Sequence, residues 1–197
     1  MNLGDRTREQ FDENIRLHQL SAETLAEPIA RAIERLASTL SEGHRLLICG
    51  NGGSAADAQH LAAELIGRFE RERPALPAIA LTTDTSILTA VGNDYQFDEI
   101  FARQVSGLGG PGDLLLAIST SGNSANVVRA IEVAHERELD VIALTGQGGG
   151  RIATQLRESD LLLAVPHART ARVQEIHLLI LHCLCDGVDA LLLGDVL

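Results

Sequence analysis

Four side chains able to exchange protons or bind a metal ion fall in two segments with helical character. His60 and Glu64 are four residues apart, so they share one face of a helix. Gln174 and His182 are eight residues apart, and the net rotation of about 80° over two turns lets both reach one cavity. An imidazole and a carboxylate can serve as acid and base, and the four together suit Zn²⁺ or a similar divalent ion. Each pair is also typical of surface pairs or buried structural histidines, so the residue types alone leave both interpretations open.

The segment Ser119-Thr-Ser-Gly-Asn-Ser124 is suited to binding phosphate. It follows an apolar run and precedes a predicted helix start. The hydroxyls of Ser119, Thr120, Ser121 and Ser124, a glycine and the free N–H groups of a helix N-terminus can together bind phosphate without lysine. A single Ser or Thr would be explained as an ordinary N-cap. Several hydroxyls beside a glycine favour phosphate binding.

A second glycine-rich loop, Gly50-Asn-Gly-Gly-Ser54, follows the first apolar run. Its backbone could approach a ligand closely, because glycine lacks the side chain that would prevent it. Neither the glycine spacing of a dinucleotide-binding turn nor the Gly-Lys-Ser/Thr of a P-loop is present. The loop is therefore less specific by itself than the segment at 119–124.

The composition excludes several classes of function. All 16 Lys+Arg positions are arginine, so a Schiff base on a lysine amine is excluded. The formal net charge of −11 argues against nonspecific binding to nucleic acid or to an anionic membrane. We find no apolar run of membrane-spanning length and no export signal, and we expect a cytoplasmic protein.

Short apolar runs alternate with amphipathic segments along the chain. We expect two helices within residues 5–41, the second beginning at Ser21. The expected strands are 45–50, 77–81, 113–118, 140–145 and 160–165, and the further expected helices are 55–67, 85–91, 97–107, 124–137 and 169–193.

This alternation predicts an α/β fold, a single domain over residues 1–197. Its core would be a five-stranded parallel sheet with helices on both faces, N-terminal helices and a long C-terminal helix. Ligands of such sheets bind at the carboxyl ends of the strands. The loops at 50–54, 119–124 and 145–150 are therefore the expected site.

Two motifs carry a resemblance to a known family. Cys49-Gly-Asn-Gly-Gly-Ser54 and Ala117-Ile-Ser-Thr-Ser-Gly-Asn-Ser124 resemble the two signature loops of sugar isomerase (SIS) domains. The similarity is to the phosphoheptose isomerase branch and covers nearly the whole chain. Further segments that resemble this branch are Arg71-Glu-Arg-Pro74, Gly92-Asn-Asp94, Ala143-Leu-Thr-Gly146 and Arg172-Val-Gln-Glu-Ile-His177.

The resemblance implies an aldose–ketose isomerase that acts through an enediol. The implied reaction converts D-sedoheptulose 7-phosphate to D-glycero-D-manno-heptose 7-phosphate, a first step towards ADP- or GDP-heptose precursors. Glu64 would be the base that removes the carbon-bound proton, and His182 its acid–base partner. The family's zinc ligands fall on His60, Glu64, Gln174 and His182, whereas His177 matches no family ligand and is expected to be structural.

The resemblance also implies a homotetramer with active sites between subunits, and we expect the helices within 5–41 to form oligomer contacts. The residues that would hold the sugar phosphate are Asn51, Gly52, Gly53, Ser54, Glu64, Asn93, Asp94, Ser119, Thr120, Ser121, Ser124 and Gln174. One position departs from the pattern. Some members carry an acidic residue where this chain has Ala171, so a proton relay through that position is absent.

A rival interpretation comes from within the same family. The DnaA initiator-associating protein is a tetrameric SIS adaptor, and Leu76–Leu81 and Cys183–Asp186 resemble it. That regulator lacks the acid–base pair, whereas this chain has both Glu64 and His182. An SIS module that senses sugar phosphate in a regulator is disfavoured, because no DNA-binding segment and no basic charge accompany it. The sequence therefore favours the enzyme.

Overall fold

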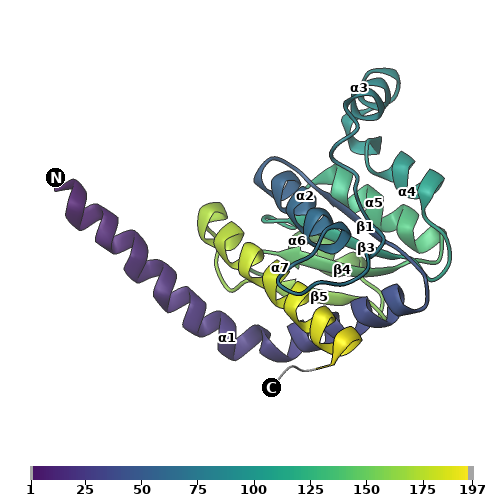
Figure 1. Ribbon diagram of the computed structural model, residues 1–197. Coiled ribbons are helices and arrows are strands. Elements are labelled where there is room, and N and C mark those ends of the chain that lie inside the picture. The colour runs from purple at the N-terminus through teal and green to yellow at the C-terminus, as the bar shows by residue number, and fades with distance from the viewer. Residues whose placement is uncertain (1, 195–197) are drawn as a thin grey trace.

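The structure, a computed structural model, describes residues 2–194 and has a five-stranded parallel sheet at its centre (Figure 1). The order of the strands is β2-β1-β3-β4-β5, and each neighbouring pair is parallel. The strands are β1 (Leu46–Gly50), β2 (Ala78–Ala80), β3 (Leu114–Ser119), β4 (Asp140–Thr145) and β5 (Leu161–Ala164). The α/β class and the five-stranded parallel sheet predicted from the sequence are confirmed.

Helices cover both faces of the sheet, as buried parallel strands require. On one face lie α1 (Leu3–Ser41), α2 (Gly53–Ile66) and α7 (Thr170–Leu193), and on the other lie α4 (Ala102–Leu108), α5 (Ala125–Glu136) and α6 (Gly150–Gln155). Alternate residues of each strand pack into the two hydrophobic cores, one on each face of the sheet. Leu46 and Ile48 of β1 face the first, and Leu47 and Cys49 face the second. The helix α3 (Thr85–Asp94) and the 3₁₀ turn η1 (Phe97–Glu99) lie at one end, where α3 stands apart from the sheet (Figure 1).

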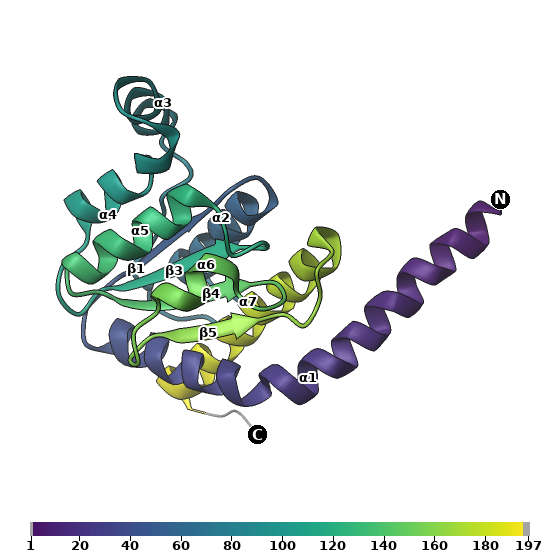
Figure 2. The same ribbon diagram turned by 180° about the vertical axis from the view of Figure 1, so that it is seen from behind.

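The N-terminal segment forms one helix, so the expectation of two helices is wrong. Ser21 was expected to cap a second helix, but it is buried inside α1. The hydroxyl of Thr24 donates to the carbonyl of Leu20 at 2.8 Å, so it is satisfied within the helix. Pro28 lies inside α1 and has no N–H to continue the ladder, which explains the bend of the helix (Figure 2).

The N-terminal turns of α1 project beyond the rest of the molecule, and the turns that follow contact α7 through Gln10 and Asn14 (Figures 1 and 2). The first half of α1 carries large apolar side chains that this chain leaves in solvent, such as Leu3 at 70% exposure and Phe11 at 67%. Ile15 and Leu20 are exposed beside them. Apolar surface of this kind on a single chain commonly marks an interface.

The helix α6 was not predicted. It begins directly after the glycines at 148 and 149, the second of which has a positive φ of 71° and stands at the N-cap. Glycine-rich stretches usually indicate loops, so the sequence pattern concealed this short helix.

The helix α7 reaches the length and mean hydropathy of a membrane-spanning helix, which the sequence analysis did not anticipate. Buried core helices of water-soluble proteins share these properties, and α7 packs between α1 and α2 with Val173, Ile180 and Leu184 in the core. Its place in the fold therefore explains the buried part of its apolar surface, while Leu178, Leu179 and Leu191 are exposed in this chain.

Candidate active site

Two loops meet where the strand order reverses. β1 and β3 are neighbours in the sheet, while the chain leaves β1 for the β2 edge and leaves β3 for the β4 edge. The loops after such strands form a crevice that commonly binds ligands. Asn51, after β1, and Asn126, in the first turn of α5, exchange two side-chain hydrogen bonds of 2.8 Å each. The structure thus brings the two predicted loops together.

The hydroxyls of the loop after β3 converge. Ser119 Oγ and Ser124 Oγ are 2.9 Å apart. Ser124 is the N-cap of α5, but among residues 2–194 its side chain accepts no capping hydrogen bond from that helix. The Ser124 hydroxyl is paired with Ser119 and not with the helix, so the simple explanation of Ser124 as a stabilising cap does not account for it.

A close approach between two backbones fixes the shape of this loop. Gly122 has a positive φ of 66°, and a Cβ on it would overlap with the carbonyl of Gly149. The amide of Ile152 in α6 donates to the Gly122 carbonyl at 3.0 Å. The unpredicted helix α6 therefore supports the loop that carries Thr120 and Ser121.

The loop after β1 is in contact with α7. A Cβ on Gly53 would overlap with the side-chain amide of Gln174, so the amide lies directly over the first turn of α2. Gly52 has a positive φ of 57°, and Ser54 is buried. The glycines admit Gln174 to the N-terminus of α2, which places it at the predicted site.

His60, Glu64 and His182, the candidates for acid–base chemistry, lie together in one cluster. His60 Nε2 lies 2.9 Å from His182 Nε2 and 3.6 Å from Glu64 Oε1. The side chains of His60 and Glu64 are 38% and 23% exposed, so solvent or a ligand can reach them. Helix α2 presents the first two on one face, as their spacing predicted, and α7 supplies the third.

Two residues of this cluster were missed by the sequence analysis. Phe69 stacks on His182 with ring centroids 5.6 Å apart, a tertiary contact for which the sequence holds no signal. Asp57 lies three residues before His60 in α2, and its Oδ2 has no hydrogen-bond partner within the described part of the chain. Burial raises the pKa of the Asp57 carboxyl, and the charge of His60 partly opposes this. Its helical spacing from His60 was the available signal.

His177 is fully buried, in agreement with its expected structural role. Its Nε2 lies 3.1 Å from the carbonyl oxygen of Thr145, which links α7 to the end of β4. Burial lowers the pKa of the imidazole to about 4, and the hydrogen bond to Thr145 opposes this weakly. The ring is neutral at physiological pH.

Asn93 and Asp94 lie away from the cluster within this chain. They are exposed at the end of α3, where Asn93 Nδ2 donates to Asp94 Oδ1 at 2.9 Å. Helix α3 packs against η1 and stands apart in Figure 1. Their predicted contact with substrate remains a prediction.

The donor atoms suit a divalent metal ion in their chemistry. Two facing imidazole nitrogens with a carboxylate beside them are ligand types that zinc prefers. Within residues 2–194, however, no three His, Cys, Asp or Glu side chains surround a common point as a formed metal site would. The chain therefore brings His60 and His182 together, with Glu64 nearby and Gln174 about two turns before His182 in α7.

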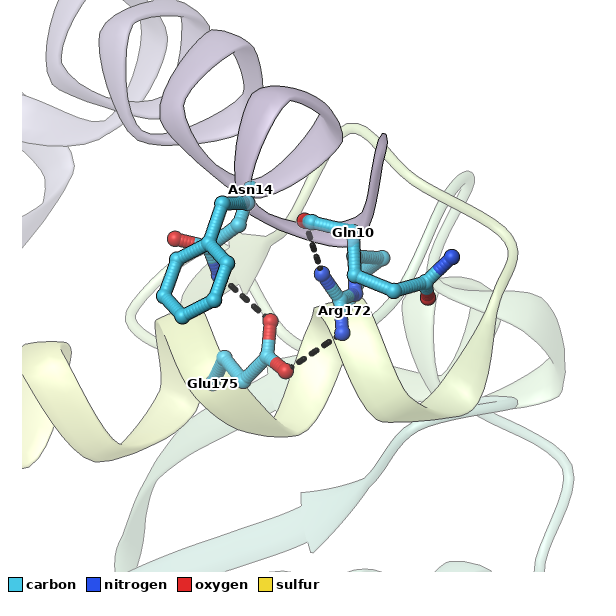
Figure 3. Close-up of a pocket in the computed structure, with 5 residues that line it drawn as sticks. Gln10, Asn14, Arg172 and Glu175 are labelled. Carbon is cyan, nitrogen blue, oxygen red and sulfur yellow. Dashed lines mark hydrogen bonds and ion pairs between the residues drawn. The ribbon is translucent and has the colours of Figure 1, made fainter. Parts of the chain in front are cut away.

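The first turns of α7 are hydrogen-bonded to the first half of α1 (Figure 3). Arg172 donates to the carbonyl of Gln10 at 2.7 Å and to Glu175 at 2.6 Å, and Glu175 also accepts from Asn14. These residues border a cavity of about 230 Å³. Because Gln174 lies between Arg172 and Glu175, this attachment fixes the turn that reaches the site.

The chain is similar to known proteins in both sequence and structure. The family model described as "SIS domain" matches residues 10–146. The phosphoheptose isomerase of Azoarcus sp. (strain BH72) is 59% identical over 194 residues, which is 98% of each chain. The structure of a phosphoheptose isomerase from Neisseria gonorrhoeae has a TM-score of 0.92 at 53% identity, covering 96% of this chain and 100% of that one. One from Francisella tularensis has a TM-score of 0.94 at 46% identity, covering 96% and 99%.

Proposed function

The chain belongs to the SIS domain family and is an isomerase of the phosphoheptose isomerase type, and from this premise we propose that it converts D-sedoheptulose 7-phosphate to D-glycero-D-manno-heptose 7-phosphate. The observation that carries the proposal is the cluster of His60, Glu64 and His182 beside loops suited to phosphate. Similarity to named isomerases supports a sugar phosphate as the class of substrate. The choice of the seven-carbon sugar within that class is our proposal.

The reaction needs one proton moved between carbons and another between oxygens. Glu64 takes the proton from C1 of the ketose and returns it to C2 of the enediol, while His182 passes a proton between O1 and O2. Groups positioned for such transfers typically contribute 10²–10⁴-fold each. His60, 2.9 Å from His182, is placed to set the tautomer of that imidazole.

The phosphate would bind at the loop after β3. Ser119, Ser121 and Ser124 offer hydroxyls, and α5 begins directly after this loop, so its N-terminus lies beside them. The reactive end of the sugar then extends toward α2 and α7. Asn51 and Gln174 can hydrogen-bond the sugar hydroxyls between them.

A zinc ion held by His60, Glu64, Gln174 and His182 is part of the proposal. When bound, the ion would polarise the carbonyl or orient the sugar hydroxyls. Support comes from the donor types, since imidazole nitrogens and a carboxylate are ligands that zinc prefers.

We further propose a homotetramer whose sites are completed by neighbouring subunits. The exposed apolar face of α1 supports this, as does an apolar groove of about 340 Å³ between α1 and α7. Asn93 and Asp94, remote from the cluster in one chain, would reach the site of a neighbour. Light scattering after size exclusion tests the assembly, and a monomer at micromolar concentration would contradict it.

The proposed place of action is the cytoplasm, at the start of heptose precursor synthesis for lipopolysaccharide or another glycoconjugate. The adaptor interpretation has less support, because the relatives matched at 59% identity are named as isomerases and the acid–base pair is present. Incubation with sedoheptulose 7-phosphate tests the enzyme directly. Formation of the aldose heptose phosphate supports the proposal, and an unchanged substrate contradicts it.

A further inference from the structure

Arg73 is buried where the end of α2 meets α7. Its side chain is 1% exposed, and that of Asp189 on α7 is 3% exposed. Arg73 Nε donates to Asp189 Oδ1 at 2.6 Å, while its other nitrogens donate to the carbonyls of Leu65 and Glu64 at 2.8 Å each. Carbonyls in the last turn of a helix lack partners within the helix. One guanidinium therefore bonds to two carbonyls at the end of α2, of which that of Leu65 also accepts from the Leu76 amide, and joins them to α7.

Both ends of this connection belong to the elements that carry the acid–base groups. On α2, Arg73 donates directly to the backbone carbonyl of Glu64. Asp189 follows His182 by seven residues, about two turns, so the two share one side of α7. Cys185 lies between them, and its pKa is raised to about 12, first by burial and then by the charges of Glu64 and Asp189. The connection therefore adjoins the Glu64–His182 pair.

The buried ion pair of Arg73 and Asp189 is not needed merely to fill the space between α2 and α7. Asp189 Oδ2 is buried and has no hydrogen-bond partner among residues 2–194, so Arg73 supplies the compensation for this carboxylate. Apolar pairs of similar volume often replace buried ion pairs without loss of stability. An apolar pair, however, cannot form hydrogen bonds to the Glu64 carbonyl and to α7 at the same time.

We propose that Arg73, through Asp189, is a positioning residue that sets the separation between Glu64 on α2 and His182 on α7. The inference rests on the proposed function for its catalytic consequence, since these two groups are the proposed base and its partner. Arg73 acts through them and does not touch the substrate. Loss of the connection lets α2 shift against α7, and a displacement of about 1 Å can cost about 100-fold in rate.

The test compares the double variant Arg73→Met/Asp189→Leu with a control that loses stability elsewhere. The double variant removes both charges and so leaves neither one buried alone. Arg73→Lys keeps the charge opposite Asp189 but lacks the fork that spans three acceptors. The control, Ile131→Ala on α5, opens a cavity in the core on the other side of the sheet.

We expect both Arg73 variants to assemble like the wild type, with kcat reduced about 10- to 100-fold and KM within about 3-fold. The KM is preserved because the phosphate loops are untouched. The control should keep the wild-type kcat at temperatures below its melting transition. Wild-type kcat in both Arg73 variants, or an equal loss in Ile131→Ala, would overturn the proposal.

A second readout separates this inference from the proposed reaction. In protein labelled with ¹⁵N-histidine, we expect the imidazole signals of His60 and His182 to shift in the Arg73 variants and not in Ile131→Ala. If the wild type fails to convert the sugar while these signals shift, the proposed reaction is wrong and the positioning role is supported. If the wild type turns over and the signals stay unchanged in the Arg73 variants, the positioning role is wrong.

Discussion

His60 on α2 and His182 on α7 face each other through Nε2 atoms that are 2.9 Å apart, although 122 residues separate them in the chain. This distance is that of a hydrogen bond, in which one ring nitrogen donates and the other accepts. Glu64, 3.6 Å from His60, adds a carboxylate to the same cluster. Helices α2 and α7 therefore bring together the three side chains that we propose as the acid–base site.

Replacement of the proposed base should abolish turnover without disturbing the fold. Glu64→Gln keeps nearly the same shape, and Glu64 is partly exposed, so little stability is lost. We expect kcat to fall by about 10²–10⁴-fold. The measurement is steady-state turnover, with light scattering and thermal melting as controls. Activity within about 3-fold of the wild type would place the base elsewhere.

Gly53 should be intolerant of a side chain because Gln174 occupies the space of its Cβ. In Gly53→Ala the amide of Gln174 must move away, and we expect kcat/KM to fall by about 10-fold or more. Gly107→Ala is the matched control, since Gly107 is exposed in α4 and a Cβ there meets open space within the described structure. Equal activity of the two variants would show that Gln174 is dispensable.

The buried imidazole of His177 should make stability depend on pH. Its folded pKa of about 4 lies below the ordinary pKa of 6.5 for a histidine, so the unfolded chain takes up a proton first as the pH falls. Stability is therefore lost between about pH 6.5 and pH 4 and changes no further below that range. The loss from this group amounts to about 3 kcal/mol per subunit.

His177→Gln removes this titration and can still donate to the carbonyl of Thr145. Urea unfolding of both proteins between pH 7 and pH 4 should show that the wild type loses about 3 kcal/mol more than the variant. Parallel curves for the two proteins would contradict the assignment of a neutral, buried His177.

Removal of the proposed zinc should lower thermal stability as well as activity. A ligand present at 100 times its dissociation constant stabilises the folded state by about 2.7 kcal/mol, so chelation should lower the melting temperature by several degrees. Readdition of zinc should restore it. His60→Gln, which loses one proposed ligand, should respond less. If the purified wild type contains no stoichiometric metal and melts identically with chelator, the zinc site is wrong.

Much of the fold could be predicted because its signals are local. Apolar runs separated by amphipathic segments indicated the parallel sheet, and glycine or hydroxyl-rich turns marked its carboxyl edge. The prediction of two helices within 5–41 was wrong because Ser21, a residue type that often caps helices, is buried inside α1. The short helix α6 was concealed by the glycines that precede it.

The site was predictable in part for the same reason. Helical spacing put His60 and Glu64 on one face, but their meeting with His182 depends on how α7 packs against α2. Phe69 and the Arg73–Asp189 pair act only through tertiary contacts, which no local pattern encodes. Asn93 and Asp94 remain a prediction about contacts beyond one chain.

The measurement that tests the proposed reaction most directly is NMR of the purified protein with sedoheptulose 7-phosphate in deuterated water, with and without zinc. The proposal predicts conversion to the manno-heptose 7-phosphate with deuterium entering at C2, because the proton removed by Glu64 exchanges with solvent. Glu64→Gln should leave the substrate unchanged under the same conditions. No conversion by a well-folded wild-type oligomer, with or without zinc, would contradict the assignment of this substrate.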